Sequence, residues 1–469
     1  MILEQVYLGC LSQASYLIVD EATRTAAVVD PRRDTAVYRE KAEKLGATIR
    51  HVLLTHFHAD FLAGHLELRE GTGAKIHLGR RGRAEYPFEP MADGGALEFG
   101  NVRLEFLETP GHTPESTCIV VYDLAKDRKK PVAVLTGDTL FIGDVGRPDL
   151  MVASGMKAED LAAMLQESLQ TKLLALPDET IVYPGHGAGS SCGKSLSSET
   201  SSTIGQQRKL NWALQPMPRT EFVRRLTADL CPPPAYFAHD AELNRAEHPI
   251  LEHQLESWLT PLELDRALAL VRFGAQLLDT RDAAAFAAEH LRGSINIGLS
   301  GRYASWAGTL LDPQTPIVLV TEPGKESESA LRLARIGFDT IAGCLRNGVQ
   351  AAAARPELLV RGARVTHEDL ARRLAAKDPP QVVDVRTDAE WNAGHIHGAL
   401  HLVLDDLAKN AASLPKGREL VVVCKSGYRS SIGSSLIERA GFTRVTDLSG
   451  GMDAWTEGRQ RVEAGEPAR

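Results

Sequence analysis

The stretch "HVLLTHFHADF", residues 51–61, decides how the first part of the chain folds. An apolar run leads into a turn on which His56, His58 and Asp60 stand close together. Imidazole and carboxylate groups gathered behind a strand are typical of a metal site. Phe61 follows directly, and its apolar ring cannot bind a metal ion. The question is therefore which metal chemistry fits a turn that ends in such a side chain.

Three further apolar runs end in the same kind of residue. His112 follows "RLEFLETPG", Asp138 follows "VAVLTG" and His186 follows "TIVYPG". Taken singly, a histidine after a strand is more often a satisfied polar residue, and Asp138 could cap a helix. Together with His56 they place four such residues at strand ends, where open α/β sheets form their ligand sites. The set predicts a common site.

The first part of the chain reads as a layered α/β domain. Up to about residue 205, β-branched runs such as "SYLIVD" and "AAVVD" alternate with amphipathic stretches such as "MKAEDLAAMLQESL". This alternation predicts buried strands covered by helices. The proline-rich segment that follows is expected to form the tail of this domain and a connector.

The rest of the chain repeats itself. Residues 275–299, "AQLLDTRDAAAFAAEHLRGSINIGL", and residues 380–404, "PQVVDVRTDAEWNAGHIHGALHLVL", share an apolar strand ending in Asp, an amphipathic helix and a similar turn. The two copies lie a whole domain apart, so they predict two tandem α/β domains. We expect three domains, with boundaries at residues 1–245, 246–358 and 359–469.

Composition and charge limit the partners. The 469 residues carry 53 Lys and Arg against 61 Asp and Glu, a formal net charge of -8, without a long basic run. Nucleic acid is therefore not expected as a partner. No apolar run reaches the roughly 18 residues of a membrane span, so a cytoplasmic protein is expected. Six widely spaced cysteines argue against a disulfide scaffold, and homo-oligomer formation stays open.

The motifs "THFHAD", "PGHT", "TGD" and "YPGH" resemble those of the metallo-β-lactamase superfamily, an αββα sandwich. Hydrolytic members with two zinc ions carry a further histidine where this chain has Phe61, so the resemblance implies one metal ion. Persulfide dioxygenases of this superfamily hold one Fe(II) with two histidines and an aspartate, which match His56, His112 and Asp138. Three ligands leave about three of six octahedral positions open, as an oxygenase needs. The remaining motif residues would support the ligands from a second layer: His58, Asp60 and His186.

Two nearby segments add to this resemblance. In "DTLFIGDVGRPDL", residues 138–150, Arg147 matches an arginine that binds the anionic end of the persulfide substrate. The segment "HGAGSSCGKS", residues 186–195, lacks the Asp-Tyr pair of glutathione-using relatives, which argues against glutathione as the thiol carrier. Cys192 in this segment is a candidate sulfur relay, and Lys194 is expected to lower its pKa. An inert loop cysteine is the alternative.

A second site is predicted in "LVVVCKSGYRSSIGSSLIERAGF", residues 420–442. Cys424 stands between an apolar strand and a helix, where backbone N–H groups and the helix N-terminus stabilise a thiolate or a bound anion. Lys425 and Arg429 add positive charge and are expected to bind the substrate. The segment resembles the rhodanese family of sulfurtransferases, in which this cysteine carries a persulfide. A phosphatase of related fold is disfavoured, because its loop is longer.

The middle copy departs from this pattern. It reads "IVLVTEPGKESES" at residues 317–329, with Thr321 in place of the cysteine and Glu322 in place of the lysine. Without a thiol the domain cannot carry sulfur, so we expect an inactive rhodanese-like domain. Cys344 is expected to be structural.

The combined resemblance is to bacterial fusions of a persulfide dioxygenase with rhodanese domains. It implies that one Fe(II) per chain oxidises a low-molecular-weight persulfide, of coenzyme A, glutathione or a similar thiol, with O2 to sulfite. Cys424 would pass sulfane sulfur to sulfite to form thiosulfate, or catalyse the reverse, in sulfide detoxification. A zinc-dependent thioester hydrolase of the glyoxalase II type is the alternative enzyme, and a scaffold or persulfide sensor is the alternative without catalysis.

Overall fold

The computed structural model of the protein describes residues 1–152, 155–228 and 230–465. The chain forms two compact units, each with its own sheets and core. The first consists of Met1–Gln254 together with Ala334–Gly337, and the second of Leu255–Leu333 and Phe338–Arg469. The predicted division into three domains stays a prediction.

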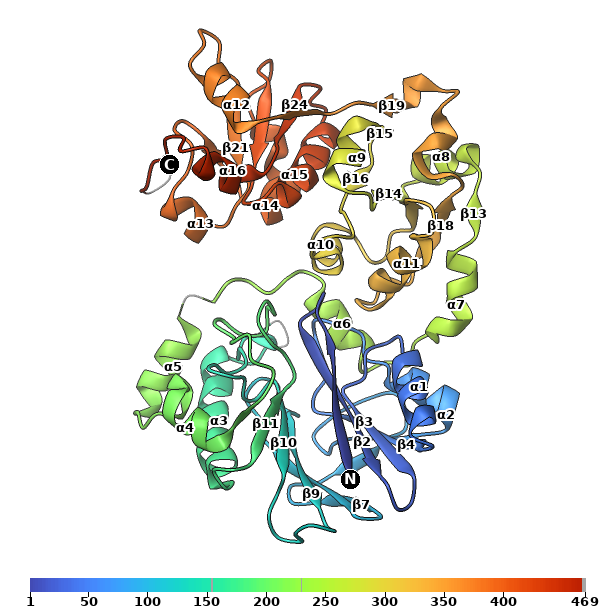
Figure 1. Ribbon diagram of the computed structural model, residues 1–469, viewed down its shortest axis with the longest axis vertical. Helices are drawn as coiled ribbons and strands as arrows, with labels where there is room; N and C mark the ends of the chain where they lie inside the picture. Colours follow the sequence, from blue (N-terminus) through green and yellow to red (C-terminus); the bar gives the residue numbers. More distant parts are fainter. Residues whose placement is uncertain (153–154, 229, 466–469) are drawn as a thin grey trace. The chain divides into compact units, whose positions relative to one another are not determined.

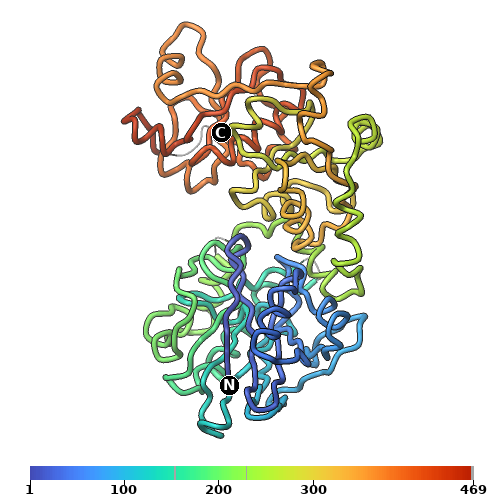
Figure 2. The backbone as a smooth tube through the Cα atoms, turned by 45° about the vertical axis from the view of Figure 1, so that its right-hand side comes forward, coloured from blue at the N-terminus to red at the C-terminus, as the bar shows by residue number. Residues whose placement is uncertain are grey.

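The first unit contains two six-stranded sheets, which run in sequence order from edge to edge. One sheet consists of β1 (Ile2–Leu8), β2 (Gln13–Asp20), β3 (Thr25–Val29), β4 (Thr48–Leu54), β5 (Lys75–Gly79) and β6 (Glu89–Met91). The other consists of β7 (Ala96–Phe99), β8 (Val102–Glu108), β9 (Thr117–Asp123), β10 (Ala133–Gly137), β11 (Ile181–Pro184) and β12 (Ser202–Thr203). The antiparallel β1–β2 hairpin is the twisted dark blue ladder above the N-terminus in Figure 2.

The two sheets pack face to face through apolar side chains. In β8, "VRLEFLE", every second residue is buried, so the strand turns one face towards the other sheet. Its Leu104 and Phe106 share a core with Ile18 and Val29 of the first sheet. This burial of apolar area, at roughly 25 cal/mol per Å², stabilises the sandwich.

Helices cover the outer faces of both sheets (Figure 1). The helices of the unit are α1 (Ala36–Lys44), α2 (His65–Thr72), α3 (Ala158–Thr171), α4 (Ile204–Leu210), α5 (Arg219–Thr227) and α6 (Phe237–Leu243). Leu165 and Leu169 of α3 pack with Phe222 of α5 against the second sheet. The layers confirm the predicted αββα sandwich. The helix α7 (Leu251–Trp258) runs across the boundary to the second unit.

The second unit contains two parallel five-stranded sheets, in the orders β13-β18-β17-β14-β16 and β20-β24-β23-β21-β22. The first half comprises β13 (Pro261–Leu262), α8 (Leu264–Arg272), β14 (Gln276–Asp279), α9 (Ala283–Ala288), β15 (His290–Leu291), β16 (Ile295–Asn296), α10 (Tyr303–Leu310), β17 (Ile317–Val320), α11 (Glu326–Ala334), β18 (Ile341–Leu345) and β19 (Leu359–Val360). The second half comprises β20 (Ala363–Val365), α12 (His367–Leu374), β21 (Gln381–Asp384), α13 (Asp388–Ala393), β22 (Leu400–His401), α14 (Leu404–Asn410), β23 (Leu420–Val423), α15 (Tyr428–Arg439), β24 (Val445–Leu448) and α16 (Gly451–Glu457).

The sequence repeat is visible as a repeated ion pair at the end of a central strand. Arg386 binds both carboxylate oxygens of Asp384 after β21, and Arg281 binds Asp279 in the same way after β14. These charges are buried, so each arginine must be fully paired, and each also donates to a carbonyl eight residues further on. Two tandem α/β folds are confirmed. In the described residues, no helix is long and apolar enough to cross a membrane.

We expect Phe106→Ala to destabilise the first unit by about 3–5 kcal/mol, because the fully buried ring would leave a cavity between the sheets. Hydrogen exchange of peptides from β8 and β9, followed by mass spectrometry, measures this free energy for the first unit separately. The control is Leu210→Ala, whose side chain is 77% exposed and should change stability by less than about 0.5 kcal/mol. Equal effects of the two variants would contradict the proposed core.

Candidate functional site

Strand ends of both sheets carry the predicted site residues of the first unit. His56 follows β4, Asp138 directly follows β10, and His186 follows β11. His112 lies in the loop between β8 and β9. At Gly137, where the backbone turns with a φ of 49°, an added methyl group would lie 2.5 Å from the Thr55 hydroxyl. The strand ends can therefore approach one another only because this position has no side chain.

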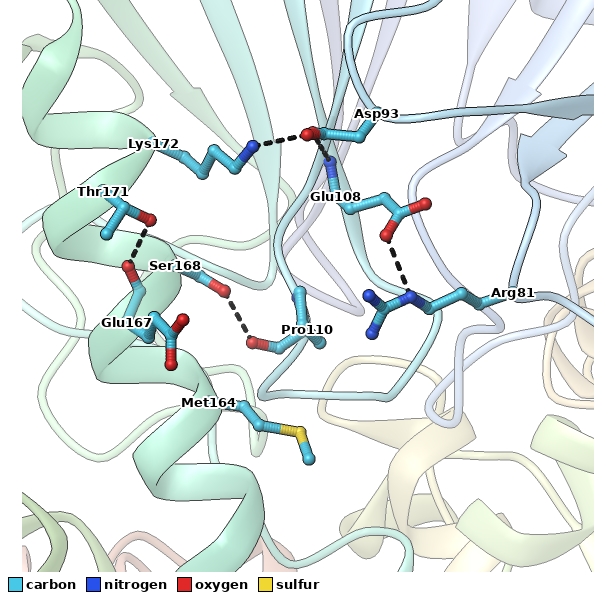
Figure 3. A pocket seen from close by; sticks show the side chains of 9 residues that line it. All are labelled: Arg81, Asp93, Glu108, Pro110, Met164, Glu167, Ser168, Thr171 and Lys172. Carbon is cyan, nitrogen blue, oxygen red and sulfur yellow. Dashed lines mark hydrogen bonds and ion pairs between the residues drawn. The ribbon is translucent and has the colours of Figure 1, made fainter.

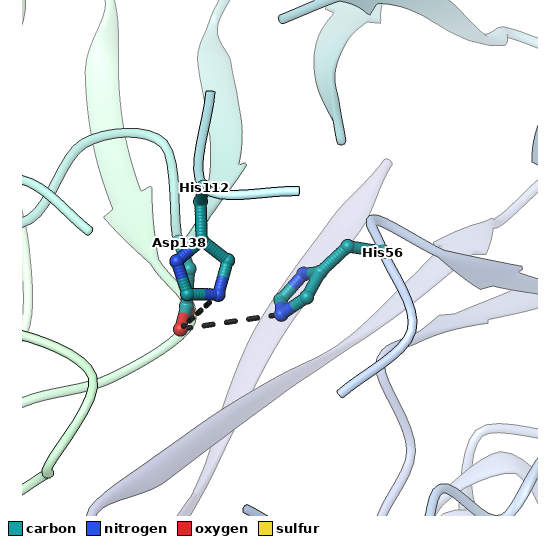
Figure 4. A group of neighbouring side chains, drawn as sticks. All are labelled: His56, His112 and Asp138. Carbon is teal, nitrogen blue, oxygen red and sulfur yellow. Dashed lines mark ion pairs between the residues drawn. The ribbon is translucent and has the colours of Figure 1, made fainter. Parts of the chain in front are cut away.

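His56, His112 and Asp138 converge on one point (Figure 4). The Nε2 atoms of His56 and His112 lie 4.0 and 3.5 Å from Oδ2 of Asp138. All three side chains are buried. This is the set that the sequence predicts as metal ligands, and His58 is not part of it. Two imidazoles and one carboxylate at these distances form a compact facial set for one ion.

A second layer fixes the orientation of each ligand. The Thr55 hydroxyl donates to Asp30 and lies 2.9 Å from Nδ1 of His56. Nδ1 of His112 lies 2.8 Å from the carbonyl oxygen of Arg147, which can only accept. Both rings therefore carry their proton on Nδ1 and direct the lone pair of Nε2 into the site.

The converging atoms fit a metal ion. Among the described residues, Nε2 of His112 and Oδ2 of Asp138 are buried without any hydrogen-bond partner. Buried polar atoms are rarely left without a partner, because their desolvation costs about 1–3 kcal/mol each. A cation bound to both atoms would satisfy them. Added side chains at Gly146 and Gly185 would meet His112 and Asp138 at 2.9 and 2.6 Å, so the backbone also closes tightly around the ligands.

The charges of the site suit metal binding. Burial lowers the pKa of His56 well below its ordinary value and also lowers that of His112, so both imidazoles are neutral, as metal binding requires. Burial alone would raise the pKa of Asp138, but the surrounding imidazoles, His186 first, hold it well below its usual range. His186 lies between two carboxylates, with Nδ1 2.8 Å from Asp138 and Nε2 2.8 Å from Asp60. Although burial opposes it, these carboxylates raise the pKa of His186 well above its ordinary value.

The structure answers the question that Phe61 raises. Its ring is buried and lies 4.3 Å from the ring of His58 and 6.4 Å from that of His186, centroid to centroid. The space in which a further histidine would stand is therefore filled by carbon. His58 turns away to Asp30, with Nε2 3.0 Å from Oδ1.

The sequence prediction missed Asp30 and Thr55. Asp30 ends the run "AAVVD" after β3 and accepts from both the amide and the hydroxyl of Thr55. It thereby holds Thr55, which holds His56. An aspartate at a strand end was the available signal, the same that pointed to Asp138.

Cys192 is buried and its thiol lies within 4.8 Å of ligand atoms of Asp60 and His186. Burial raises the pKa of Cys192 well above its ordinary value, and the charges of Asp60 and Asp138 add to this. The expectation that Lys194 lowers this pKa is wrong. The Lys194 ammonium instead donates to the carbonyls of Arg225 and Ala228 at the end of α5.

Arg147 lies behind His112 with its guanidinium bound to the chain itself. It contacts both oxygens of Asp149, at 2.6 and 2.8 Å, and the carbonyls of Ser191 and Cys231. Its amide donates to the carbonyl of Cys192. These contacts give Arg147 a positioning role for His112 and the Cys192 loop, and its predicted grip on the substrate stays a prediction.

A separate cavity of about 320 Å³ lies in the first unit beside α3 (Figure 3). Four of its charged side chains are paired with one another, Lys172 with Asp93 at 2.5 Å and Arg81 with Glu108 at 2.9 Å, and Glu167 lies 3.6 Å from Arg219. We assign it no ligand.

The second predicted site lies at the carboxyl end of β23. Cys424 is buried, and its Sγ accepts from the amide of Gly427 at 3.1 Å and lies 3.5 Å from the Ser430 hydroxyl. Carbonyls of Cys424 and Lys425 accept from the amides of Met452 and Asp453 in α16. The loop thus holds the sulfur at the N-terminus of α15, where a thiolate is stabilised.

The charged residues of this loop differ in their surroundings. Lys425 is exposed. Arg429 forms a two-bond ion pair with Glu390, at 2.6 and 2.8 Å, so only part of its charge is available to a substrate anion. Burial would raise the pKa of Glu390, but the Arg429 pair and the backbone of Thr387 lower it to about 2. In the other half of the unit, Thr321 occupies the position that corresponds to Cys424, and its side chain is buried. Cys344 is also buried, and its thiol donates to the carbonyl of Trp258.

Comparisons with known proteins assign both parts of the chain to families. Residues 8–186 match the metallo-β-lactamase superfamily, and residues 262–355 and 366–458 match the rhodanese-like domain family. A metallo-β-lactamase structure from Staphylococcus aureus is 31% identical with a TM-score of 0.66, over 73% of this chain and 98% of its own. This chain belongs to the metallo-β-lactamase superfamily. It also carries two rhodanese-like domains, hereafter the middle domain (residues 262–355) and the C-terminal domain (residues 366–458). Both family predictions are confirmed.

Two curated relatives of the superfamily differ in their named activities. A probable hydroxyacylglutathione hydrolase of Schizosaccharomyces pombe is 33% identical over 187 residues, which are 39% of this chain and 66% of that relative. The human mitochondrial persulfide dioxygenase is 28% identical over 213 residues, or 45% of this chain and 75% of its own. Similarity to both leaves the reaction to be argued from the site.

Thr55→Val should weaken metal binding about 10- to 100-fold, because it removes the hydroxyl that orients His56. Competition of the purified protein with a coloured chelator for Fe(II) or Zn(II) measures the affinity. Thr48→Val is the matched control, since Thr48 is exposed at the start of β4, the strand that Thr55 follows. If both variants bind metal as the wild type does, Thr55 does not position a ligand.

Proposed function

We propose that this protein oxidises a low-molecular-weight persulfide at one Fe(II) and transfers sulfane sulfur through Cys424. The observation that carries the proposal is the buried set of His56, His112 and Asp138, with Phe61 filling the place of a further ligand. Such a set leaves coordination positions for O2 and substrate. The similarity to a persulfide dioxygenase supports the same reaction.

The proposed oxidation consumes the persulfide RSSH, O2 and water, and gives the thiol RSH, sulfite and two protons. Iron, when bound, would activate O2 and bring it next to the persulfide sulfur. The candidate thiols are coenzyme A, glutathione and similar carriers.

The residues of the chain would prepare this reaction in three ways. Asp138 stays ionised through His186, which Asp60 holds on its other side. Thr55 and the Arg147 carbonyl keep Nε2 of both histidines unprotonated. Phe61 and Phe141, both buried against His186, would limit access of water. Cys192 is a candidate sulfur relay, although it would need to lose its proton first.

In the proposed transfer, Cys424 takes the outer sulfur of a persulfide and releases the thiol. The Cys424 persulfide then gives this sulfur to sulfite, forming thiosulfate and restoring the cysteine. The amide of Gly427 and the start of α15 would stabilise the thiolate in both steps. Sulfite from the first site is the acceptor at the second, so joining both in one chain raises its local concentration. The reverse order, in which thiosulfate supplies the sulfur, uses the same residues.

The iron-loaded protein should consume oxygen and produce sulfite when a persulfide of coenzyme A or glutathione is added. Asp138→Asn should lower this rate at least about 100-fold, because it removes a charged ligand. An oxygen electrode and sulfite assay measure the reaction, with the exposed Asp178→Asn as control. Absence of oxygen uptake with every persulfide in protein that holds iron would overturn the proposal.

A zinc-dependent thioester hydrolase is the second candidate, favoured by the similarity to hydroxyacylglutathione hydrolases. It requires hydrolysis of an acyl-glutathione by the zinc-loaded protein without oxygen uptake. The same preparations, loaded with iron or with zinc, separate the two reactions.

Cys424→Ser should leave oxygen uptake unchanged and abolish thiosulfate, so that sulfite accumulates instead. The control is Cys231→Ser, because the Cys231 side chain is exposed and its contact with Arg147 is made by the backbone carbonyl, which the substitution keeps. Undiminished thiosulfate in Cys424→Ser would contradict the proposed coupling.

A further inference from the structure

The Cys424 loop is held on one side by α16 of its own domain, and Arg429, just after the loop, pairs with Glu390 of α13. The amides of α16 bind the carbonyls of Cys424 and Lys425, and a methyl group at Gly451 would lie 2.4 Å from the first of these carbonyls. On the other side the loop runs directly into Tyr428, the first residue of α15. Contacts of Tyr428 therefore act directly on the loop that holds the Cys424 sulfur.

Tyr428 contacts the middle domain. Its hydroxyl donates to the carbonyl of Gly298 at 2.7 Å. Its ring lies so close to Gly301 that a methyl group there would come within 2.4 Å of a ring carbon. Burial raises the pKa of Tyr428 above its ordinary value, as expected for a phenol enclosed by protein. The contact combines one directional hydrogen bond with a steric fit.

The surface that Tyr428 meets is held by hydrogen bonds within the middle domain. Arg332 of α11 donates to the carbonyls of Leu299 and Gly301, at 2.6 and 3.0 Å. The Asn296 side chain donates to the carbonyls of Asp279 and Arg281 at the end of β14. The segment 296–301 is thus tied to the central strand of its own domain and to α11. The helix α11 follows the loop with Thr321, as α15 follows the loop with Cys424.

One face of α15 continues this contact. The Ser431 hydroxyl donates to the side-chain oxygen of Asn296, and the Ser435 hydroxyl accepts from the backbone amide of Asn296. Arg439 donates to the carbonyl of Gly293. These positions recur at helical spacing from Tyr428 onwards, so they share one face. The two serines are 4% and 0% exposed, and hydroxyls buried to this extent need hydrogen-bond partners. Asn296 supplies the acceptor for Ser431 and a donor to Ser435, whose own proton goes to the carbonyl of Ile432 in α15.

We propose that the middle domain, which lacks a sulfur-carrying cysteine, positions the Cys424 loop, and that Tyr428 is the positioning residue. The inference goes beyond the proposed sulfur transfer, on which it rests, by giving the inactive domain a part in it. Thr321 makes the middle domain unable to carry sulfur itself, but its segment 296–301 needs only backbone carbonyls and a glycine to act on its neighbour.

Two variants test the inference in the full chain. Tyr428→Phe removes the hydrogen bond and keeps the ring, whereas Gly301→Ala pushes on the ring from the middle domain. Each should lower sulfur transfer from thiosulfate to cyanide about threefold to tenfold, chiefly through kcat. In this assay Cys424 takes the outer sulfur of thiosulfate, sulfite leaves, and cyanide takes up the sulfur as thiocyanate.

A second readout does not depend on turnover. In both variants, iodoacetamide should alkylate Cys424 more slowly than in the wild type at pH 7, but with the same limiting rate at high pH. Mass spectrometry of the peptide that contains Cys424 measures these rates. The control is Ser300→Ala, an exposed neighbour of Gly301, which should match the wild type.

The outcomes distinguish the positioning role of Tyr428 from the proposed sulfur transfer. Wild-type alkylation profiles and turnover in both Tyr428→Phe and Gly301→Ala would overturn the positioning role. A lower free energy of unfolding with an unchanged alkylation profile would also overturn it, because it indicates a purely structural contact. If the wild type transfers no sulfur but alkylation responds as expected, the proposed sulfur transfer fails and the positioning role stands.

Discussion

The buried meeting of two imidazoles with one carboxylate is the constraint on which the first unit depends. None of the three groups can approach the others unless its far side is held, since each would otherwise lose water without gaining a partner. Thr55, the Arg147 carbonyl and His186 provide these holds. The layers of the sandwich bring the strand ends together, and the second layer of polar residues determines which atoms face inwards.

The Cys424 loop follows the opposite principle. Its sulfur is held by backbone amides and the start of a helix, and its charged neighbours are only partly available, because Arg429 is paired with Glu390. A site of this kind depends on the position of the backbone more than on any one side chain. It is therefore sensitive to whatever holds the helix, including a neighbouring domain.

The sequence allowed much of this arrangement to be predicted, for a physical reason. His56, His112, Asp138 and Cys424 all stand where an apolar strand ends, and strand ends can be located from local pattern alone. Asp30 and Thr55 were missed as a pair, because their contact requires the parallel register of β3 and β4, which no local pattern encodes. The Lys194 ammonium donates to carbonyls 31 and 34 residues further along the chain, so charge near a cysteine was a poor guide to its pKa.

Gly301 shows that a position in a domain without a sulfur-carrying cysteine can be constrained by the neighbouring domain. Its missing side chain leaves room for the Tyr428 ring of the next domain. A substitution at this position would appear as a fault of the C-terminal domain, although it lies in the middle one. Cutting the pair apart to study the C-terminal domain alone would remove the same support, so the isolated fragment would be a different catalyst from the one in the intact chain.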